Sequence, residues 1–206
     1  FISKIFKYIK NMRIIFILVL ILASYNLLAA GQSDYHTSFE NSIDFPMDMA
    51  MMLWSNNMSM HWTVDGDYIH IGMRAHTLGW MALGISLNGL MVDSDVWVGA
   101  IEDGVVIMED YYFSSKKMKC PGICQDIDYA NPGTNDLFNV SGQETNDGWT
   151  EISFTRLLDT GDDTYDKPIN VGDVNIIYAH DHYGMDRFQF HYMSLILFFL
   201  SFKKYI

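Results

Sequence analysis

The sequence predicts an all-β protein, folded as an antiparallel sandwich or barrel. Short segments of apolar or alternating residues recur between residues 60 and 179, and turn-forming Gly, Asn and Asp residues separate them. No segment after residue 31 shows a helical apolar period over a useful length, so helices are not expected there. Several short strands with turns between them are typical of sandwiches and barrels.

The expected strands follow one another through the middle and the end of the chain. Residues 68–75 alternate most clearly, because Ile69, Ile71 and Met73 share one face opposite polar neighbours. Residues 114–148 are polar and are interpreted as a long insertion between strands. The expected strands, in chain order, are residues 60–64, 68–75, 80–85, 96–101, 105–113, 149–156 and 174–179.

Composition limits both the size and the partners of the protein. The chain has 206 residues, of which 50% are hydrophobic, so it can form one domain with an apolar core. It carries 25 acidic against 13 basic residues, a formal net charge of −12. Such a surface repels phosphate backbones, and the sequence holds no basic patch with interleaved aromatic residues. Nucleic-acid binding is therefore not expected.

The start of the chain resembles a leader placed before the domain. Residues 1–11 contain no initiator methionine and receive no assignment. Residues 12–31 have a positive start, an apolar run over residues 14–23 and small residues near Ala30, which is the layout of a secretory signal peptide. The alternative is an uncleaved membrane anchor, although the apolar run is shorter than the ~20 residues that span a bilayer. We therefore expect a secreted protein, or one in the lumen of the secretory pathway.

Two further features agree with secretion. Cys120 and Cys124 are the only cysteines, and in an oxidising compartment they can close a small local disulfide. A metal site would need further ligands beside this pair, and none lie nearby in the sequence. Asn57 and Asn139 begin Asn-x-Ser sequons and are the expected glycosylation sites.

Short motifs occur in succession along the chain. They are WTVDGDYI at 62–69, GWMALGIS at 79–86, GLMVDSDV at 89–96, DYY at 110–112, ISFTRLL at 152–158, TGD at 160–162, Asp166, and IIYA at 176–179. Together they resemble the DOMON domain, a family named for the N-terminal domain of dopamine β-monooxygenase that also occurs in secreted and membrane-anchored cytochromes. The resemblance implies an immunoglobulin-like antiparallel β-sandwich of roughly ten strands. We expect this domain to cover residues 45–192, followed by an apolar tail at residues 193–206.

The cytochrome members of this family imply a heme site. They hold a b-type heme between a methionine and a histidine, and the resemblance places the methionine at Met91. The histidine falls at His191, with His182 and His180 as alternatives. Thioether and imidazole ligands raise the iron potential, which suits one-electron transfer. The apolar residues expected to exclude water from the porphyrin are Trp80, Met81, Leu90 and Trp97.

The resemblance implies a secreted binding module that is not an enzyme by itself. With heme b it would exchange electrons with a redox partner, either a membrane cytochrome or an oxidoreductase. Without heme it would bind a sugar, a catechol or a partner protein, or serve as the accessory domain of a truncated copper monooxygenase. The aromatic residues proposed to contact such a ligand are Tyr111, Tyr112, Trp97 and Trp149.

No catalytic residue and no metal ligand is assigned. The sequence contains no nucleophile elbow, phosphate loop or paired-carboxylate signature. His180 and His182, on one face of a strand, are an alternative metal site. Arg156 and Asp110 are expected to be structural and to pair across strands. Acidic loops can bind calcium, but no EF-hand spacing is present, so the acidic loop residues are interpreted as solvated turns. They are Asp93, Asp95, Asp159, Asp162, Asp163 and Asp166.

Overall fold

The chain divides into two units, Phe1–Ser38 and Phe39–Ile206, and all residues that the structure describes belong to the second. The predicted leader therefore lies outside the described residues. So do three predicted site residues, His182, His191 and Asn57. The computed structural model describes residues 39–45, 58–117, 119–170 and 172–181, and the backbone of residues 198–202.

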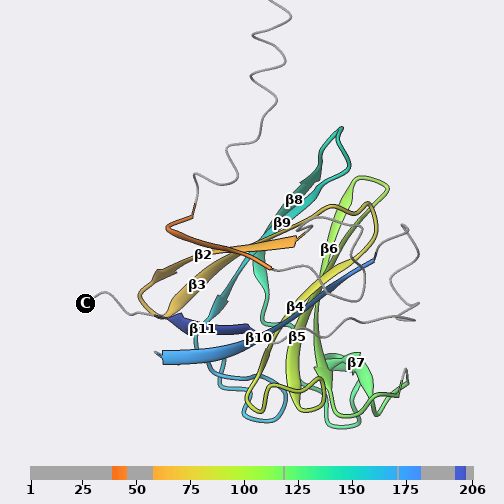
Figure 1. The fold of residues 1–206 in the computed structure, drawn as a ribbon. Helices are drawn as coiled ribbons and strands as arrows, with labels where there is room; N and C mark the ends of the chain where they lie inside the picture. Colours follow the sequence, from red (N-terminus) through yellow and green to blue (C-terminus); the bar gives the residue numbers. More distant parts are fainter. Residues whose placement is uncertain (1–38, 46–57, 118, 171, 182–197, 203–206) are drawn as a thin grey trace, which may run out of the picture. The chain divides into compact units, whose positions relative to one another are not determined.

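One layer of the fold is a five-stranded antiparallel sheet (Figure 1). Its spatial order is β1-β2-β3-β9-β8, so that β1 and β8 form its two edges. The strands are β1 (Asn41–Asp44), β2 (Met58–Asp65), β3 (Tyr68–Ala75), β9 (Thr150–Leu157) and β8 (Phe138–Glu144).

The other layer is a six-stranded antiparallel sheet with the order β11-β10-β4-β5-β6-β7. The link from β3 to β4 carries the chain from the first sheet to the second, and β8 and β9 return to the first. The strands are β11 (Phe198–Phe202), β10 (Gly172–His180), β4 (Met81–Ser86), β5 (Ser94–Glu102), β6 (Val105–Phe113) and β7 (Ile123–Gln125).

The predicted all-β sandwich is confirmed. Among the described residues eleven strands form the two sheets, against the roughly ten expected. The one helical element described is a 3-10 turn at Asp126–Asp128. In the described part of the chain, no helix is long and apolar enough to cross a membrane. The predicted disulfide is also present and joins Cys120 to Cys124, which lies in β7.

Four strands were not predicted: β1, β7, β8 and β11. β8 lies inside the stretch interpreted as a polar insertion, and all of its residues are exposed. A strand without a buried face shows no apolar alternation, so the sequence carries no signal for it. β7 has only three residues, too few to show a period.

The main core lies between the two sheets. In β3, Ile69, Ile71 and Met73 are fully buried, as their alternation predicts. From the other sheet, Leu83 and Trp97 pack into the same cluster. Burying an apolar side chain of this size contributes about 1.5–3 kcal/mol, so these contacts supply much of the stability of the sandwich.

A second apolar cluster covers the outer face of the six-stranded sheet. It is built largely from small side chains, including Ala82, Val96 and Val98, and Met91 packs partly against it. This sheet is therefore apolar on both faces. The remaining members of the outer cluster are Trp80, Ala100, Tyr111, Phe113, Ile123, Ile177 and Ala179.

Candidate functional site

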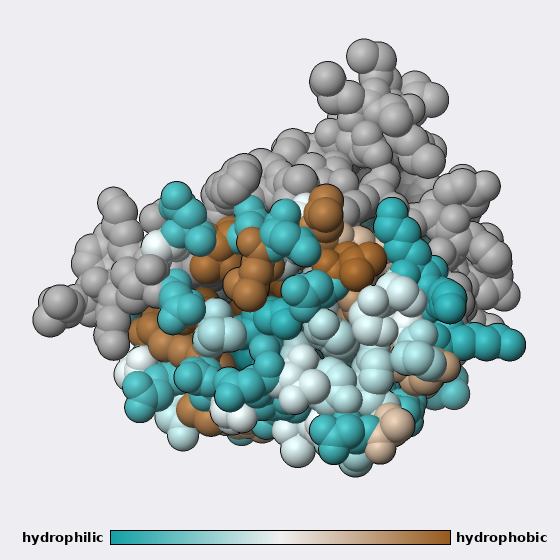
Figure 2. Space-filling view, turned by 90° about the horizontal axis from the view of Figure 1, so that it is seen from below, coloured by the Kyte–Doolittle hydropathy of each residue, from teal (hydrophilic) through white to brown (hydrophobic). Residues whose placement is uncertain are grey.

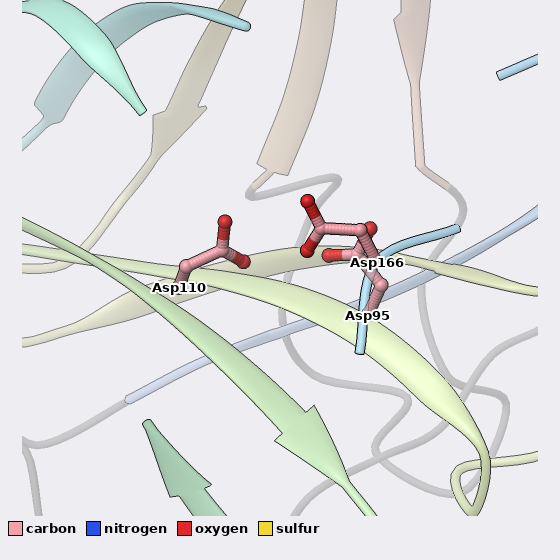
Figure 3. A group of neighbouring side chains, drawn as sticks. All are labelled: Asp95, Asp110 and Asp166. Atoms are coloured by element: carbon pink, nitrogen blue, oxygen red, sulfur yellow. The ribbon is translucent and has the colours of Figure 1, made fainter. Parts of the chain in front are cut away.

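Three buried aspartates meet inside the sandwich near its β7 end (Figure 3). Asp95 lies in β5, Asp110 in β6 and Asp166 in the loop that follows β9. One carboxylate oxygen of each lies within 4.8 Å of the others. In the β5–β6 ladder Trp97 pairs with Asp110, so Asp95 and Asp110 are diagonal neighbours on the inward face. Their positions follow from strand alternation.

One arginine from the opposite sheet reaches these carboxylates. Arg156 lies in β9 and its side chain is completely buried. Its Nη1 donates a hydrogen bond of 2.8 Å to Asp95 Oδ2, and its Nη2 lies 3.6 Å from Asp166 Oδ2. The predicted pairing of Arg156 with Asp110 is therefore wrong in its partner, since both ion pairs of Arg156 are made with other aspartates. The role assigned to Arg156, a structural contact across strands, agrees with the geometry.

The acidic group is short of hydrogen-bond donors. Asp95 Oδ2 accepts bonds from Arg156 and from the backbone N–H of Lys167, at 2.8 and 2.9 Å. Asp95 Oδ1 and both oxygens of Asp110, Asp126 and Asp166 are buried and have no hydrogen-bond partner among the described residues. An unpaired buried polar group costs about 1–3 kcal/mol. These unpaired oxygens therefore lower the stability of the folded protein, and a bound cation would offset that cost.

Burial and mutual repulsion shift the acidity of these aspartates. Burial, and then the charge of Asp95, raises the pKa of Asp126 to about 8 and that of Asp166 to about 7. The same two causes raise the pKa of Asp110 well above its usual range. Arg156 opposes the shifts of Asp110 and Asp166, but one guanidinium interacts with three carboxyl groups, those of Asp95, Asp110 and Asp166. Without a further cation, the group therefore retains protons near neutral pH.

Three tyrosines lie beside the acidic residues, each one to three positions along the chain from one of them. We call Tyr112, Tyr129 and Tyr165 the tyrosine rim. Tyr129 and Tyr165 are stacked with ring centroids 4.7 Å apart, and Tyr112 meets Tyr165 edge-on at 5.5 Å. Viewed from below in Figure 2, this end of the molecule is largely hydrophilic, with hydrophobic side chains in separate groups. The acidic residues themselves are buried beneath it.

A glycine allows the two loops of the site to approach each other. A Cβ atom added to Gly133 would lie 2.7 Å from Asp162 Oδ2, 2.7 Å from Tyr165 Cδ2 and 3.1 Å from Asp126 Cβ. The Gly133 N–H also donates a 3.0 Å bond to the Asp126 carbonyl. The loop that carries Asp126 is therefore held directly against the loop that carries Asp166.

The predicted heme ligands are only partly described. Met91 is half-buried on the outer face of the six-stranded sheet, and its carbonyl accepts a 2.5 Å bond from the Ser94 hydroxyl. His180 pairs with Met81 at the beginning of β4, whereas Met91 follows the other end of that strand. A strand of this length spans roughly 16 Å. The structure therefore does not bring Met91 and His180 together, and His182 and His191 lie outside the described residues.

The predicted porphyrin pocket is not assembled as expected. Trp80 belongs to the outer cluster and Trp97 to the inner core, so the two rings lie on opposite faces of the same sheet. Leu90 lies in a loop and is 58% exposed. The prediction grouped these residues because they are close together in one hairpin. It was wrong because the strand register decides which side chains share a face, and here it separates them.

Of the aromatic contacts proposed for a non-heme ligand, Tyr112 belongs to the tyrosine rim, and the ring of Trp97 lies 5.1 Å from the guanidinium carbon of Arg156. Tyr111 lies in the outer cluster. Trp149 instead stacks under Arg74, whose guanidinium carbon lies 3.6 Å from the ring centroid.

Among the acidic residues, the interpretation as solvated turns is wrong for Asp95 and Asp166, which are 1% and 4% exposed. Asp126 was missed because it lies in a polar loop that shows no pattern. Asp110 was identified as a motif residue but not as a ligand.

The sequence of the chain matches a known protein family. The DOMON domain family model matches residues 55–181, more than half of the chain, so the chain belongs to the DOMON family. It is 27% identical over 121 residues to DBH-like monooxygenase protein 1 of Homo sapiens, and over 125 residues to that of Mus musculus. These matches cover 59% and 60% of the chain. They cover 18% of each relative, so the chain spans less than a fifth of their length.

Two solved structures have a similar arrangement of strands. The cytochrome b domain of pyranose dehydrogenase from Coprinopsis cinerea superposes with a TM-score of 0.47 and 11% identity, covering 70% of this chain and 76% of that one. The cytochrome domain of Myriococcum thermophilum cellobiose dehydrogenase gives a TM-score of 0.46 and 9% identity, covering 79% and 88%.

Proposed function

We propose that this DOMON domain is a non-catalytic binding module that holds a divalent cation among Asp95, Asp110 and Asp166, with the charge of Asp126 acting on the same group. One observation carries the proposal. Both carboxylate oxygens of Asp110, which is 2% exposed, lack a hydrogen-bond partner, and one lies within 4.8 Å of oxygens of Asp95 and Asp166. A buried carboxylate in this position would be stabilised by a metal ion, since no donor among the described residues bonds to it.

The ligand set favours calcium. Carboxylate oxygens are hard ligands that bind Ca²⁺, Mg²⁺ or Mn²⁺ rather than copper or zinc. Calcium–oxygen distances are about 2.3–2.6 Å, so two ligands on opposite sides of one ion lie about 4.6–5.2 Å apart. The three aspartate oxygens lie within 4.8 Å of one another, which admits an ion of this size. Calcium accepts a cage of protein oxygens in flexible geometry, whereas Mg²⁺ usually keeps several of its waters.

Calorimetric titration with calcium chloride tests the cation site. The wild-type protein should bind one ion, and D110N should bind it far more weakly, because the substitution removes one ligand charge without changing the volume of the side chain. D103N is the matched control. Asp103 lies in the exposed β5–β6 turn at a φ of 51°, which asparagine also tolerates. Equal binding by D110N and wild type would exclude the proposed site.

The same titration has a second readout, the number of protons released when calcium binds. Because Asp126 and Asp166 have pKa values of about 8 and about 7 without the ion, calcium must displace protons from them at neutral pH. The binding heat should therefore depend on the ionisation enthalpy of the buffer. Affinity should rise as the pH increases from about 6 to about 9. A binding heat that is the same in every buffer would contradict the assignment of these ligands.

A second function is proposed for Met91, which packs against an outer cluster with a floor of small side chains. Such a surface suits a flat ligand, and heme b held by Met91 and His191 or His182 is the candidate. Purified protein incubated with hemin should develop a Soret band that shifts on reduction. The band should be lost or altered in M91A but not in L90A, the exposed neighbour. If the wild-type protein takes up no heme, this second function is wrong.

We further propose secretion and a redox partner. The disulfide between Cys120 and Cys124 agrees with an oxidising compartment. The partner would be an oxidoreductase, either a separate chain or further sequence of the monooxygenase kind named in the curated relatives. Expression of the chain in cultured animal cells tests secretion. N-terminal sequencing of protein from the medium should give a start near Gly31 or Gln32, and retention of the protein inside the cell would contradict the leader assignment.

A further inference from the structure

One edge of the five-stranded sheet has few of the features that commonly prevent pairing with another chain. β8 is the outermost strand, and all seven of its residues are exposed. It contains no proline, lysine or arginine, which commonly block such edges. Phe138 and Val140 are 40% and 36% exposed, and Phe138 meets the exposed ring of Tyr68 edge-on at 5.9 Å. Among the described residues, no strand pairs with the outer side of β8.

The same strand contains a bulge at Asn139. Phe138 pairs with Thr155 and Ser141 with Ser153, so two β8 residues, Asn139 and Val140, face the single β9 residue between them. Asn139 has a φ of 52°, a left-handed conformation that asparagine adopts more readily than most residues. The bulge takes Asn139 out of the regular ladder, and its side chain is exposed.

Asn139 is also the first residue of an Asn-Val-Ser sequon. We infer that Asn139 carries an N-linked glycan, and that this glycan covers the β8 edge and prevents two copies of the chain from pairing through it. The inference rests on the proposed secretion. Three features support it, because they occur at one position: a sequon, an exposed bulge and an edge strand that pairs with no other described strand on its outer side.

The modification requires a lipid-linked oligosaccharide diphosphate as donor. The Asn139 side-chain nitrogen forms a bond to the first sugar carbon and loses a proton, while the bond from that carbon to the lipid diphosphate breaks. No oxidation or reduction takes place. In the folded protein the Ser141 hydroxyl is hydrogen-bonded to that of Ser153 at 2.8 Å. The sequon is therefore expected to react before β8 pairs with β9.

The test uses the full chain in an N57Q background, so that Asn139 is the only sequon asparagine. A heterologous leader fused before the chain directs it into the secretory pathway whatever its own first residues do. Protein from the medium should lose the mass of one glycan on treatment with peptide-N-glycosidase. S141T keeps the sequon and should show the same mass change. S141A and N139G should show none, and glycine suits the left-handed conformation at the bulge.

Light scattering after gel filtration then measures the consequence for association. The glycosylated protein should remain a monomer, whereas S141A and N139G should reach twice the monomer mass or more as concentration rises. Adding V140K to S141A should restore the monomer by placing a charge on the free edge. Absence of a glycan on the N57Q protein would overturn the modification. Monomeric S141A and N139G at every concentration would overturn the protective role, and neither result would affect the calcium proposal.

Discussion

The interior of the sandwich contains two regions that differ in how they are stabilised, the apolar core and the acidic site. β5 contributes to both from one face. Trp97 packs edge-on against Phe154 at 5.3 Å, while Asp95, two residues earlier, lies 2.8 Å from Arg156. The core gains free energy simply from burial. The acidic site loses free energy on burial, and a counter-charge, bound protons or a cation must offset the loss. The stability contributed by the acidic site should therefore depend on pH and on cation concentration. The stability contributed by the apolar core should not depend on either.

Removal of the counter-charge should have the largest effect. R156M keeps most of the side-chain volume but leaves the buried carboxylates without a cation, which typically costs about 3–5 kcal/mol. The urea concentration at half-unfolding should fall accordingly. R74M is the matched comparison, because Arg74 lies in the same sheet but is 22% exposed, and its partner Glu151 also accepts a bond from Gln143. Its loss should cost less than that of Arg156, about 1–3 kcal/mol. Equal effects of the two substitutions would contradict the contrast between the regions.

Calcium should stabilise the wild-type protein by about 2.7 kcal/mol at a concentration one hundred times its Kd. D110N should lose this gain. Without calcium, D110N should differ from wild type by only about 0.5 kcal/mol, because burial and the Asp95 charge raise the pKa of Asp110 and so disfavour its charged form, and asparagine is an uncharged side chain of the same size. Thermal unfolding with and without calcium measures both values. A calcium response in D110N equal to that of wild type would place the ion elsewhere.

In EDTA, stability should fall as the pH rises from about 4 to about 8. The pKa values of Asp126 and Asp166 rise from 3.8 to about 8 and about 7 in the folded protein, so the folded state binds more protons than the unfolded one across this range. Their stabilising effect is complete below the unfolded pKa and is lost as the pH passes the folded values. Melting temperatures measured across this range should decline, and D126N should decline less steeply. A steeper decline in D126N would show that other groups control the slope.

A small change in the core should affect stability without affecting the calcium response. I71V removes one methylene group from a completely buried side chain in β3 and should cost about 0.5–1.5 kcal/mol. The increase in melting temperature on adding calcium should match that of wild type. A reduced calcium response in I71V would show that the two regions are energetically coupled.

Sequence reasoning succeeded where the signal is local. The alternation of Ile69, Ile71 and Met73 predicts the buried face of β3, because successive strand residues point to opposite sides. The disulfide was predictable because Cys120 and Cys124 are the only cysteines and lie close together in the chain. β8 was not predictable in this way, since it buries no face and so resembles a polar loop.

The candidate site was harder to predict because its members come from distant segments. A partial signal was present, since Asp95 and Asp110 fall on inward positions of otherwise apolar strands. Counting alternation from Trp97 and Met108 would have identified both. No comparable pattern marks Asp126 or Asp166, which lie in loops rich in polar residues. Their burial depends on which loops the sandwich places together.

The sequence alone determined the all-β class, the strands with a buried face, the family resemblance and the local disulfide. Each depends on residues near one another in the chain, and such residues interact in almost any arrangement of the strands. The tertiary structure alone decided that Trp80 and Trp97 lie on opposite faces of a sheet and that Arg156 meets Asp95. It also decided that the carboxylates of Asp95, Asp110 and Asp166 meet in the interior. These outcomes depend on strand register and sheet packing, which bring together residues up to 71 positions apart, as between Asp95 and Asp166.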